Sequence, residues 1–283
     1  WFSTEESHSQ VESVVKRFKT LILSKGTSGL NLINKELSLD IPKSYKVSLR
    51  EIANSDQAVS DELKSSILVA SKNIQLVCES DKSSLSSSPI ETTKGISIWK
   101  EFRAIDSVGL YVPGGTAPLI SSLLMQIVPA SIAGCSEIVV CSPPGANGKI
   151  APEILWICKI FNVNSIYKVG GAQAILAMAY GTTIVPKVSK IFGPGNAYVS
   201  YAKELASRDV AIDLPAGPSE VMIVTNNLDN ASLAAADALS QLEHGTDSKA
   251  FIISQKLNVL TKVKSEVLKQ KKGLTREKIL NKS

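Results

Sequence analysis

Gln241 and His244 are the residues whose types and spacing could hold a metal ion. They lie near the end of ASLAAADALSQLEHG, an alanine-rich run that favours a helix, with Asn230 placed as its N-cap and Gly245 placed to end it. Residues three apart on a helix share one face, so an amide oxygen and an imidazole could bind the same ion. A histidine at a helix C-terminus is also favoured by the helix dipole, and spacing alone leaves both interpretations open.

Strands and helices that could position such residues alternate along the chain from Ile96. Short apolar runs end in glycine or proline turns, and helical runs of about ten residues follow them, as in SIYKV, GlyGly and AQAILAMAY. This alternation is typical of a parallel sheet with crossover helices. We therefore predict an α/β fold with Rossmann-like parallel sheets. The GxGxxG fingerprint with a later acidic residue is absent, so no motif establishes an ordinary dinucleotide site.

The N-terminal segment is predicted to be helical. Residues 5–25 carry apolar side chains at helical spacing, and residues 47–79 repeat the pattern, with Ser55 or Asp56 as the N-cap of a second helix. The Ser-rich stretch 81–89 reads as a loop or linker. At the other end of the chain, the basic tail reads as one amphipathic helix.

Two glycine-rich turns are each followed by an amide side chain. Gly170 and Gly171 precede Gln173, and the GlyProGly turn at 193–195 precedes Asn196. A helix N-terminus suits anionic or polar ligands, and turns at the carboxyl ends of parallel strands open on the same edge of a sheet. Glycines at such turns also serve purely structural roles, and the turns alone leave both possibilities open.

The composition is that of an ordinary soluble globular protein. The 283 residues are 44% hydrophobic and 20% charged, which is enough chain for two compact lobes. The longest apolar runs fall short of the roughly 18 residues that a membrane span requires. The N-terminus has neither a basic nor an apolar signal region, so we expect neither a membrane anchor nor export.

The charge distribution argues against a nucleic-acid-binding protein, and the cysteine pattern argues against a disulfide-bonded one. The net charge of +5 comes from residues 256–283, which hold nine Lys and Arg against two Glu, whereas the rest of the chain has 22 basic and 24 acidic residues. No aromatic residues are interleaved in that segment, so we expect no nucleic-acid partner. The four cysteines form no CxxC pair, which favours reduced thiols and a cytoplasmic location.

Six motifs occur in an order that resembles the histidinol dehydrogenase family: GLYVPGG, CSPP, VGGAQA, IFGPGNA, AIDLPAGPSE and SQLEHG. The similarity is dense from about residue 105 to 255 and looser back to about residue 10. It implies an aldehyde-dehydrogenase-like architecture of two lobes. Residues 1–111 would begin the first lobe, residues 112–217 would form the Rossmann-like second lobe, and residues 218–283 would return to the first. The resemblance also implies a homodimer.

The resemblance further implies an oxidoreductase that depends on NAD and zinc. Members of the family oxidise L-histidinol through L-histidinaldehyde to L-histidine with two NAD⁺, the last two steps of histidine biosynthesis. The matching positions in this chain fall into three groups. The implied NAD-binding residues are Tyr111, Gln173 and Asn196. The implied substrate-binding residues are Ser219, Gln241 and His244, of which Gln241 and His244 would also bind zinc.

The family pattern continues past the point where this sequence stops. The pattern continues with a GPEHL-type motif, which supplies a catalytic glutamate and histidine, and with an aspartate and a histidine that complete the zinc site. The histidines of this sequence are His8 and His244, and two zinc ligands are fewer than the three usual in catalytic sites. We expect no turnover from the chain as printed.

Two alternative hypotheses remain at this stage. One is a truncated or degenerate nucleotide-binding module that binds ligand without turnover. The other is an aldehyde dehydrogenase-like enzyme in which Cys141, before two prolines, is the nucleophile. Against the second, a cysteine is by default a small buried apolar residue.

Overall fold

The structure, a computed structural model, describes residues 5–85, 88–114, 119–214, 220–243, 248–272, 274 and 280. It divides into two compact units, Trp1–Pro215 and Ala216–Ser283, called here the N-terminal and C-terminal units. The division predicted from the family pattern, with boundaries after residues 111 and 217, stays a prediction.

A five-stranded parallel sheet forms the centre of the N-terminal unit. Its strands are β3 (Ser107–Tyr111), β4 (Glu137–Ser142), β5 (Ser165–Lys168), β6 (Lys190–Phe192) and β7 (Ala211–Ile212). They lie in the order β5-β4-β3-β6-β7, and every neighbouring pair is parallel. This is the strand order of a doubly wound Rossmann-type sheet. β4 and β5 are added on one side of β3, and β6 and β7 are added on its other side. The α/β class and the Rossmann-like sheet are confirmed.

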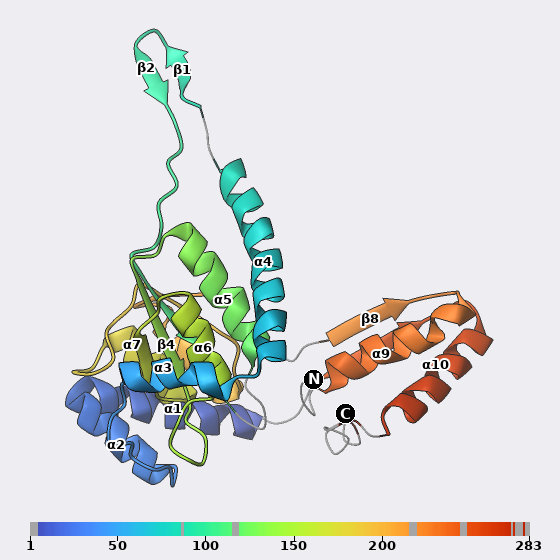
Figure 1. The fold of residues 1–283 in the computed structure, drawn as a ribbon, viewed down its shortest axis with the longest axis horizontal. Coiled ribbons are helices and arrows are strands. Elements are labelled where there is room, and N and C mark those ends of the chain that lie inside the picture. Colours follow the sequence, from blue (N-terminus) through green and yellow to red (C-terminus); the bar gives the residue numbers. More distant parts are fainter. Residues whose placement is uncertain are drawn as a thin grey trace. The chain divides into compact units, whose positions relative to one another are not determined.

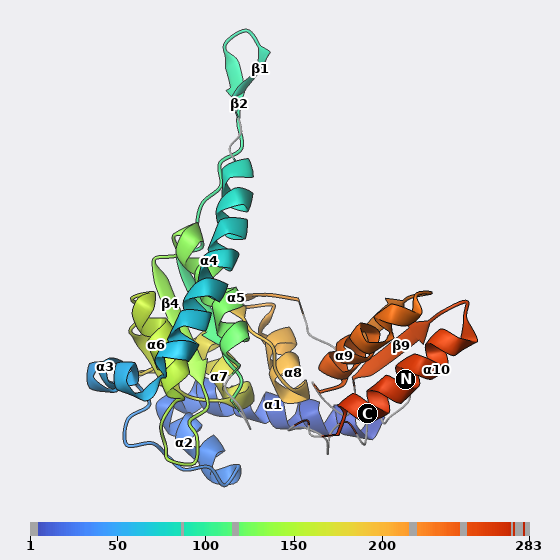
Figure 2. The same ribbon diagram turned by 45° about the vertical axis from the view of Figure 1, so that its right-hand side comes forward.

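Helices cover both faces of this sheet (Figures 1 and 2). Successive strand residues point to opposite faces, so Val139 and Cys141 join one core cluster and Val140 joins the other. The first cluster also contains residues of the helices α1 (Glu5–Lys25), α2 (Thr27–Glu36), α7 (Gly171–Tyr180) and α8 (Ala197–Ala206). The second contains residues of the helices α3 (Leu49–Ala58), α4 (Asp61–Ser84), α5 (Ile120–Ala133) and α6 (Pro152–Ile160).

The helical N-terminal segment is confirmed, but its predicted internal boundaries are wrong. α1 has the predicted bounds, whereas Ser55 and Asp56 lie inside α3 and cap nothing. The cap of α3 is Ser48, and the cap of α4 is Ser60. α4 continues to Ser84, into the stretch predicted as a loop. Periodicity identifies the apolar face of a helix but does not select one serine among several as its cap.

Several elements were not anticipated from the sequence. α2 follows α1 directly, and residues 45–47 run along the edge of β5, where the Val47 N–H donates to Ile166 and the Lys168 N–H donates to Tyr45. An antiparallel hairpin of β1 (Ile90–Thr93) and β2 (Ile96–Ile98) is exposed along its whole length. None of the described helices has both the length and the apolar character needed to cross a membrane.

The C-terminal unit is a smaller βαβ arrangement. Two parallel strands, β8 (Glu220–Val224) and β9 (Lys249–Ile253), are connected through the short helix η1 (Leu228–Asn230) and α9 (Ala231–Leu242). α10 (Leu257–Gln270) packs on α9, and both helices contribute to a core with Ile223 and Ile252 (Figure 2). Asn230 is the N-cap of α9, as predicted, although its side chain makes no capping hydrogen bond.

Glu51 links α3 to the end of β5. Its carboxylate accepts from the Ser48 N–H at 3.0 Å in a capping box, and from Lys168 Nζ at 2.6 Å. Burial alone would raise the pKa of Glu51, but the hydrogen bonds from Lys168 and Ser48 outweigh it and leave the pKa lowered. A lowered folded-state pKa stabilises the fold above the unfolded-state pKa, and this stabilisation is lost as the pH falls through the folded-state value.

We therefore expect Glu51→Gln to lower the free energy of unfolding by about 1 kcal/mol at neutral pH. The loss should shrink as the pH falls through the lowered folded-state pKa of Glu51, because the wild-type carboxylate is then protonated as well. Urea unfolding followed by the fluorescence of the buried Trp156 measures both values. Glu62→Gln, which removes an exposed carboxylate from the first turn of α4, is the matched control. An equal loss at both pH values would contradict the assignment.

Candidate functional site

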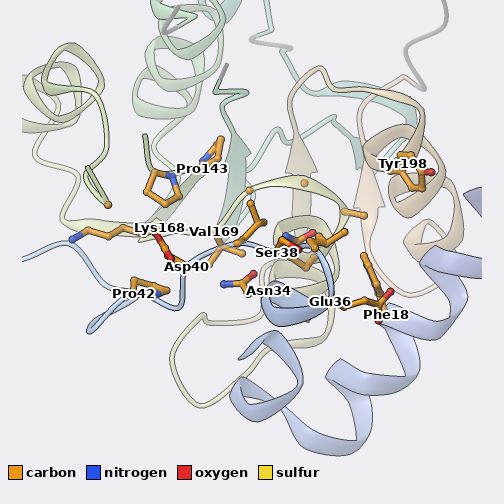
Figure 3. Close-up of a pocket in the computed structure, with 18 of the residues that line it drawn as sticks. Phe18, Asn34, Glu36, Ser38, Asp40, Pro42, Pro143, Lys168, Val169 and Tyr198 are labelled. Carbon is orange, nitrogen blue, oxygen red and sulfur yellow. The ribbon is translucent and has the colours of Figure 1, made fainter. Parts of the chain in front are cut away.

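A cavity of about 640 Å³ opens beyond the carboxyl ends of β4 and β5 (Figure 3). This volume is within the range of roughly 300–1,000 Å³ that is typical of small-molecule and cofactor sites. The segments that follow β4 and β5, the first turns of α7 and α8, and the end of α2 all contribute to its walls. Ligands of open parallel sheets bind at this edge, so the cavity is the candidate functional site.

One wall comes from the end of α2 and the segment after it. Asn34, Glu36 and Asp40 line this side, and all three are labelled in Figure 3. Asn34 Nδ2 donates to the Tyr45 hydroxyl at 3.2 Å, and that hydroxyl donates to Asn31 Oδ1 at 2.7 Å. Glu36 forms an ion pair with Arg17. No sequence motif marked this wall.

The opposite wall is formed by two turns that touch each other. A Cβ atom on Gly170 would lie 2.4 Å from Pro143 Cβ, so the CSPP and VGGAQA stretches can approach this closely because residue 170 has no side chain. Gly171 has φ +65°, a conformation that L side chains rarely adopt. These glycines are therefore required by the shape of the site.

Tyr111 lies under the start of α7. Its side chain is 5% exposed, and its hydroxyl accepts a hydrogen bond from the Gly171 N–H at 3.0 Å. Burial raises the pKa of Tyr111. Tyr111 is not among the described residues that line the cavity; in this structure it supports the turn that does.

Gln173 and Asn196 both line the cavity, although they belong to different helices. Gln173 is 3% exposed in the first turn of α7. Asn196 is the N-cap of α8, and its Oδ1 atom accepts from the Val199 N–H at 3.1 Å. Two of the three residues predicted to contact a dinucleotide therefore meet at one cavity, with the third beneath it.

The residues predicted to bind substrate and zinc belong to the C-terminal unit. Ser219 and His244 lie outside the described residues, as does Gly245. Gln241 is in the last turn of α9, and its Nε2 atom is buried without a hydrogen-bond partner. The oxygen and nitrogen of an amide are interchangeable by a flip, so this position could present a buried oxygen to a ligand.

The described residues do not by themselves make a complete zinc site. Within the described ranges, no three His, Cys, Asp or Glu side chains gather closely enough to hold a metal ion. Gln241 supplies one neutral oxygen, whereas catalytic zinc has three protein ligands. The predicted pairing of Gln241 with His244 stays a prediction.

Cys141 is not placed to act as a nucleophile. It lies on β4 with its side chain fully buried, and burial raises the pKa of its thiol. The nucleophile in cysteine catalysis is the thiolate, which requires a lowered pKa and access to the substrate. The hypothesis of an aldehyde dehydrogenase-like enzyme using Cys141 is contradicted by this burial.

We expect iodoacetamide to leave Cys141 and Cys158 unmodified in the folded chain. Both thiols are fully buried, and burial raises the pKa of Cys158 to about 12. Cys78 is only partly buried on α4 and should react, which makes it the internal control. Peptide mass spectrometry before and after unfolding in guanidinium chloride measures the labelling. Complete modification of Cys141 in the folded chain would show that the site is open to reagents.

The fold and the cavity together define a class: a doubly wound α/β protein with a cofactor-sized site at the carboxyl edge of its sheet. The Histidinol dehydrogenase family model matches residues 3–283. The chain belongs to the histidinol dehydrogenase family, which confirms the resemblance seen in its motifs.

Individual relatives agree with this membership. The histidinol dehydrogenase of Bacteroides fragilis strain YCH46 is 48% identical over 241 residues, covering 85% of this chain and 56% of the relative. That of Buchnera aphidicola subsp. Baizongia pistaciae is 42% identical over 279 residues, covering 98% of this chain and 63% of the relative. This chain therefore spans less than two thirds of the length of either relative.

A solved structure shows the same fold. The crystal structure of histidinol dehydrogenase from Elizabethkingia anophelis aligns with a TM-score of 0.92 and 38% identity, covering 100% of this chain and 64% of that one. A benzaldehyde dehydrogenase from Corynebacterium glutamicum aligns with a TM-score of only 0.46, which is too low to support an argument. The aldehyde-dehydrogenase-like arrangement of two lobes stays a prediction.

Proposed function

We propose that the protein to which this chain belongs oxidises L-histidinol through L-histidinaldehyde to L-histidine, with two NAD⁺ as hydride acceptors. The observation that carries this proposal is the cavity at which Gln173 and Asn196 meet, in a chain that matches the histidinol dehydrogenase family over residues 3–283. This reaction completes histidine biosynthesis.

NAD is proposed to bind at the carboxyl edge of the sheet in the N-terminal unit. The cavity has the volume of a cofactor site, and its walls include the first turn of α7, where a helix dipole favours a negatively charged group. Gln173 and Asn196 supply amide groups for polar contacts. Tyr111 would act from below by holding the Gly171 N–H.

Zinc and L-histidinol are proposed to bind through the C-terminal unit. Ser219, Gln241 and His244 are the residues proposed for the substrate, and Gln241 and His244 are also proposed for zinc. The support is the match of the LPAGPSE and SQLEHG stretches to the family, together with the buried Nε2 atom of Gln241, which has no hydrogen-bond partner. When bound, zinc would help to hold the substrate in orientation for hydride transfer.

A homodimer in a reducing, cytoplasmic compartment completes the proposal. The dimer rests on the family resemblance, and sedimentation or light scattering would measure it directly. The compartment is supported by the buried thiols of Cys141 and Cys158, since free thiols persist where the surroundings are reducing.

NAD⁺ binding to the chain as printed tests the N-terminal half of the proposal. We expect Gln173→Leu to weaken binding about tenfold, since it removes the polar amide while keeping similar volume. Asn196→Asp should weaken it by a similar factor, since it retains the capping oxygen and places a negative charge beside the dinucleotide phosphates. Titration calorimetry measures both dissociation constants.

The matched control is Asn227→Asp. Asn227 also caps a helix start, where its side chain accepts from the Asp229 N–H at 3.0 Å, but it belongs to the C-terminal unit. We expect it to leave the dissociation constant for NAD⁺ unchanged. Wild-type affinity in both Gln173→Leu and Asn196→Asp would remove these residues from the cofactor site.

The reaction is tested by following NADH formation through its absorbance, in the presence of L-histidinol, NAD⁺ and zinc. The assay is run on this chain and on a chain with the full length of its relatives. The proposal expects the longer chain to form about two NADH for each L-histidine, because the alcohol and the aldehyde each lose one hydride. Binding of NAD⁺ without histidinol-dependent NADH at full length would favour the alternative, a nucleotide-binding module without turnover.

A further inference from the structure

Lys203 is a buried cation that the proposed function does not use. It lies on α8 with 2% of its side chain exposed. Its Nζ atom donates to the Gly193 carbonyl oxygen at 2.9 Å and forms an ion pair with Asp213, which follows β7. A buried charge is costly unless it is paired and hydrogen-bonded, so this lysine has both of the partners it requires.

Asp213 completes a closed arrangement around Gly193. Its second oxygen, Oδ2, accepts from the Gly193 N–H at 2.8 Å. Lys203 binds the Gly193 carbonyl, so one ion pair holds both polar backbone groups of the same glycine. The Asp213 N–H donates to the Ile191 carbonyl at 3.1 Å, which fixes the carboxylate beside the end of β6.

Gly193 lies directly after β6, next to the point in the sheet where the order of strand addition reverses. It follows β6 with φ +129°, and a Cβ atom there would lie 2.1 Å from the Tyr111 carbonyl oxygen at the end of β3. Gly193, Pro194 and Asp213 also line a hollow of about 370 Å³ at this point. Three residues further along the chain, Asn196 caps α8 and lines the main cavity.

We propose that Lys203 and Asp213 are positioning residues that hold the Gly193 turn, and through it Asn196, in the geometry that binds the dinucleotide. The proposal rests on the proposed NAD site. Stability alone does not explain the pair, because apolar residues of similar size often replace a buried ion pair without loss of stability. An apolar pair cannot bind the N–H and the carbonyl of Gly193.

The test uses the double variant Lys203→Met/Asp213→Leu, which leaves neither charge buried alone. We expect the dissociation constant for NAD⁺ to rise about tenfold in a variant that still unfolds in a single cooperative transition. The matched control is Lys159→Met/Asp56→Leu, which removes an ion pair between α6 and α3 away from the cavity. The control should keep wild-type affinity.

A second variant distinguishes positioning from packing. Lys203→Met/Asp213→Asn is also neutral, but its amide oxygen can still accept from the Gly193 N–H. It should recover part of the lost affinity, and it preserves a test if the leucine variant fails to fold. Wild-type affinity in the folded leucine variant, or equal losses in both variants, would overturn the proposal.

Amide hydrogen exchange separates this proposal from the proposed function. In the leucine variant, we expect faster exchange at Gly193 and at Val199, whose N–H is bound by Asn196. If the wild-type chain does not bind NAD⁺ in calorimetry, the proposed function fails, and the exchange rates still show whether the pair holds the turn. Unchanged exchange at both amides would overturn the positioning role.

Discussion

The parallel pairing of five strands is the constraint on which the candidate site depends. Because β3 to β7 all run in one direction, the segments that follow them leave the sheet at one edge. Stretches that are far apart in the sequence, CSPP, VGGAQA and IFGPGNA, are thereby brought to one place. Two glycines allow the close packing this requires, Gly170 against Pro143 and Gly193 against the Tyr111 carbonyl. The cavity is a consequence of strand direction together with the absence of two side chains.

Buried polar contacts fix the turns at that edge. The Tyr111 hydroxyl holds the start of α7 through the Gly171 N–H, and the Lys203–Asp213 pair holds the turn before α8 through Gly193. Buried polar groups need partners, because an unpaired one costs free energy. Each of these contacts therefore restricts its turn to a narrow range of positions, which is the property that a binding site needs from its support.

The two units carry different parts of the proposed chemistry. The N-terminal unit holds the three residues proposed for NAD, Tyr111, Gln173 and Asn196, on a doubly wound sheet. The C-terminal unit holds Gln241, the described member of the proposed zinc and substrate set, at the end of the crossover helix of a βαβ arrangement. In both units, the described members of the proposed set lie at helix ends or next to turns, where backbone and side-chain polar groups are not used up by regular secondary structure.

The sequence alone determined the alternation of strands and helices, the glycine turns between them, and the order of motifs that identifies the family, since these depend on local spacing and residue type. It also located Gln173 and Asn196 as amides at helix starts. It did not determine which residue caps α4, because the spacing of apolar residues marks the buried face of a helix and does not mark the serine at which the helix begins. Only the tertiary structure decided the wall around Asp40, the burial of Cys141 and the pairing of Lys203 with Asp213. These depend on which distant segments pack together, and residue spacing along the chain carries no direct record of that packing.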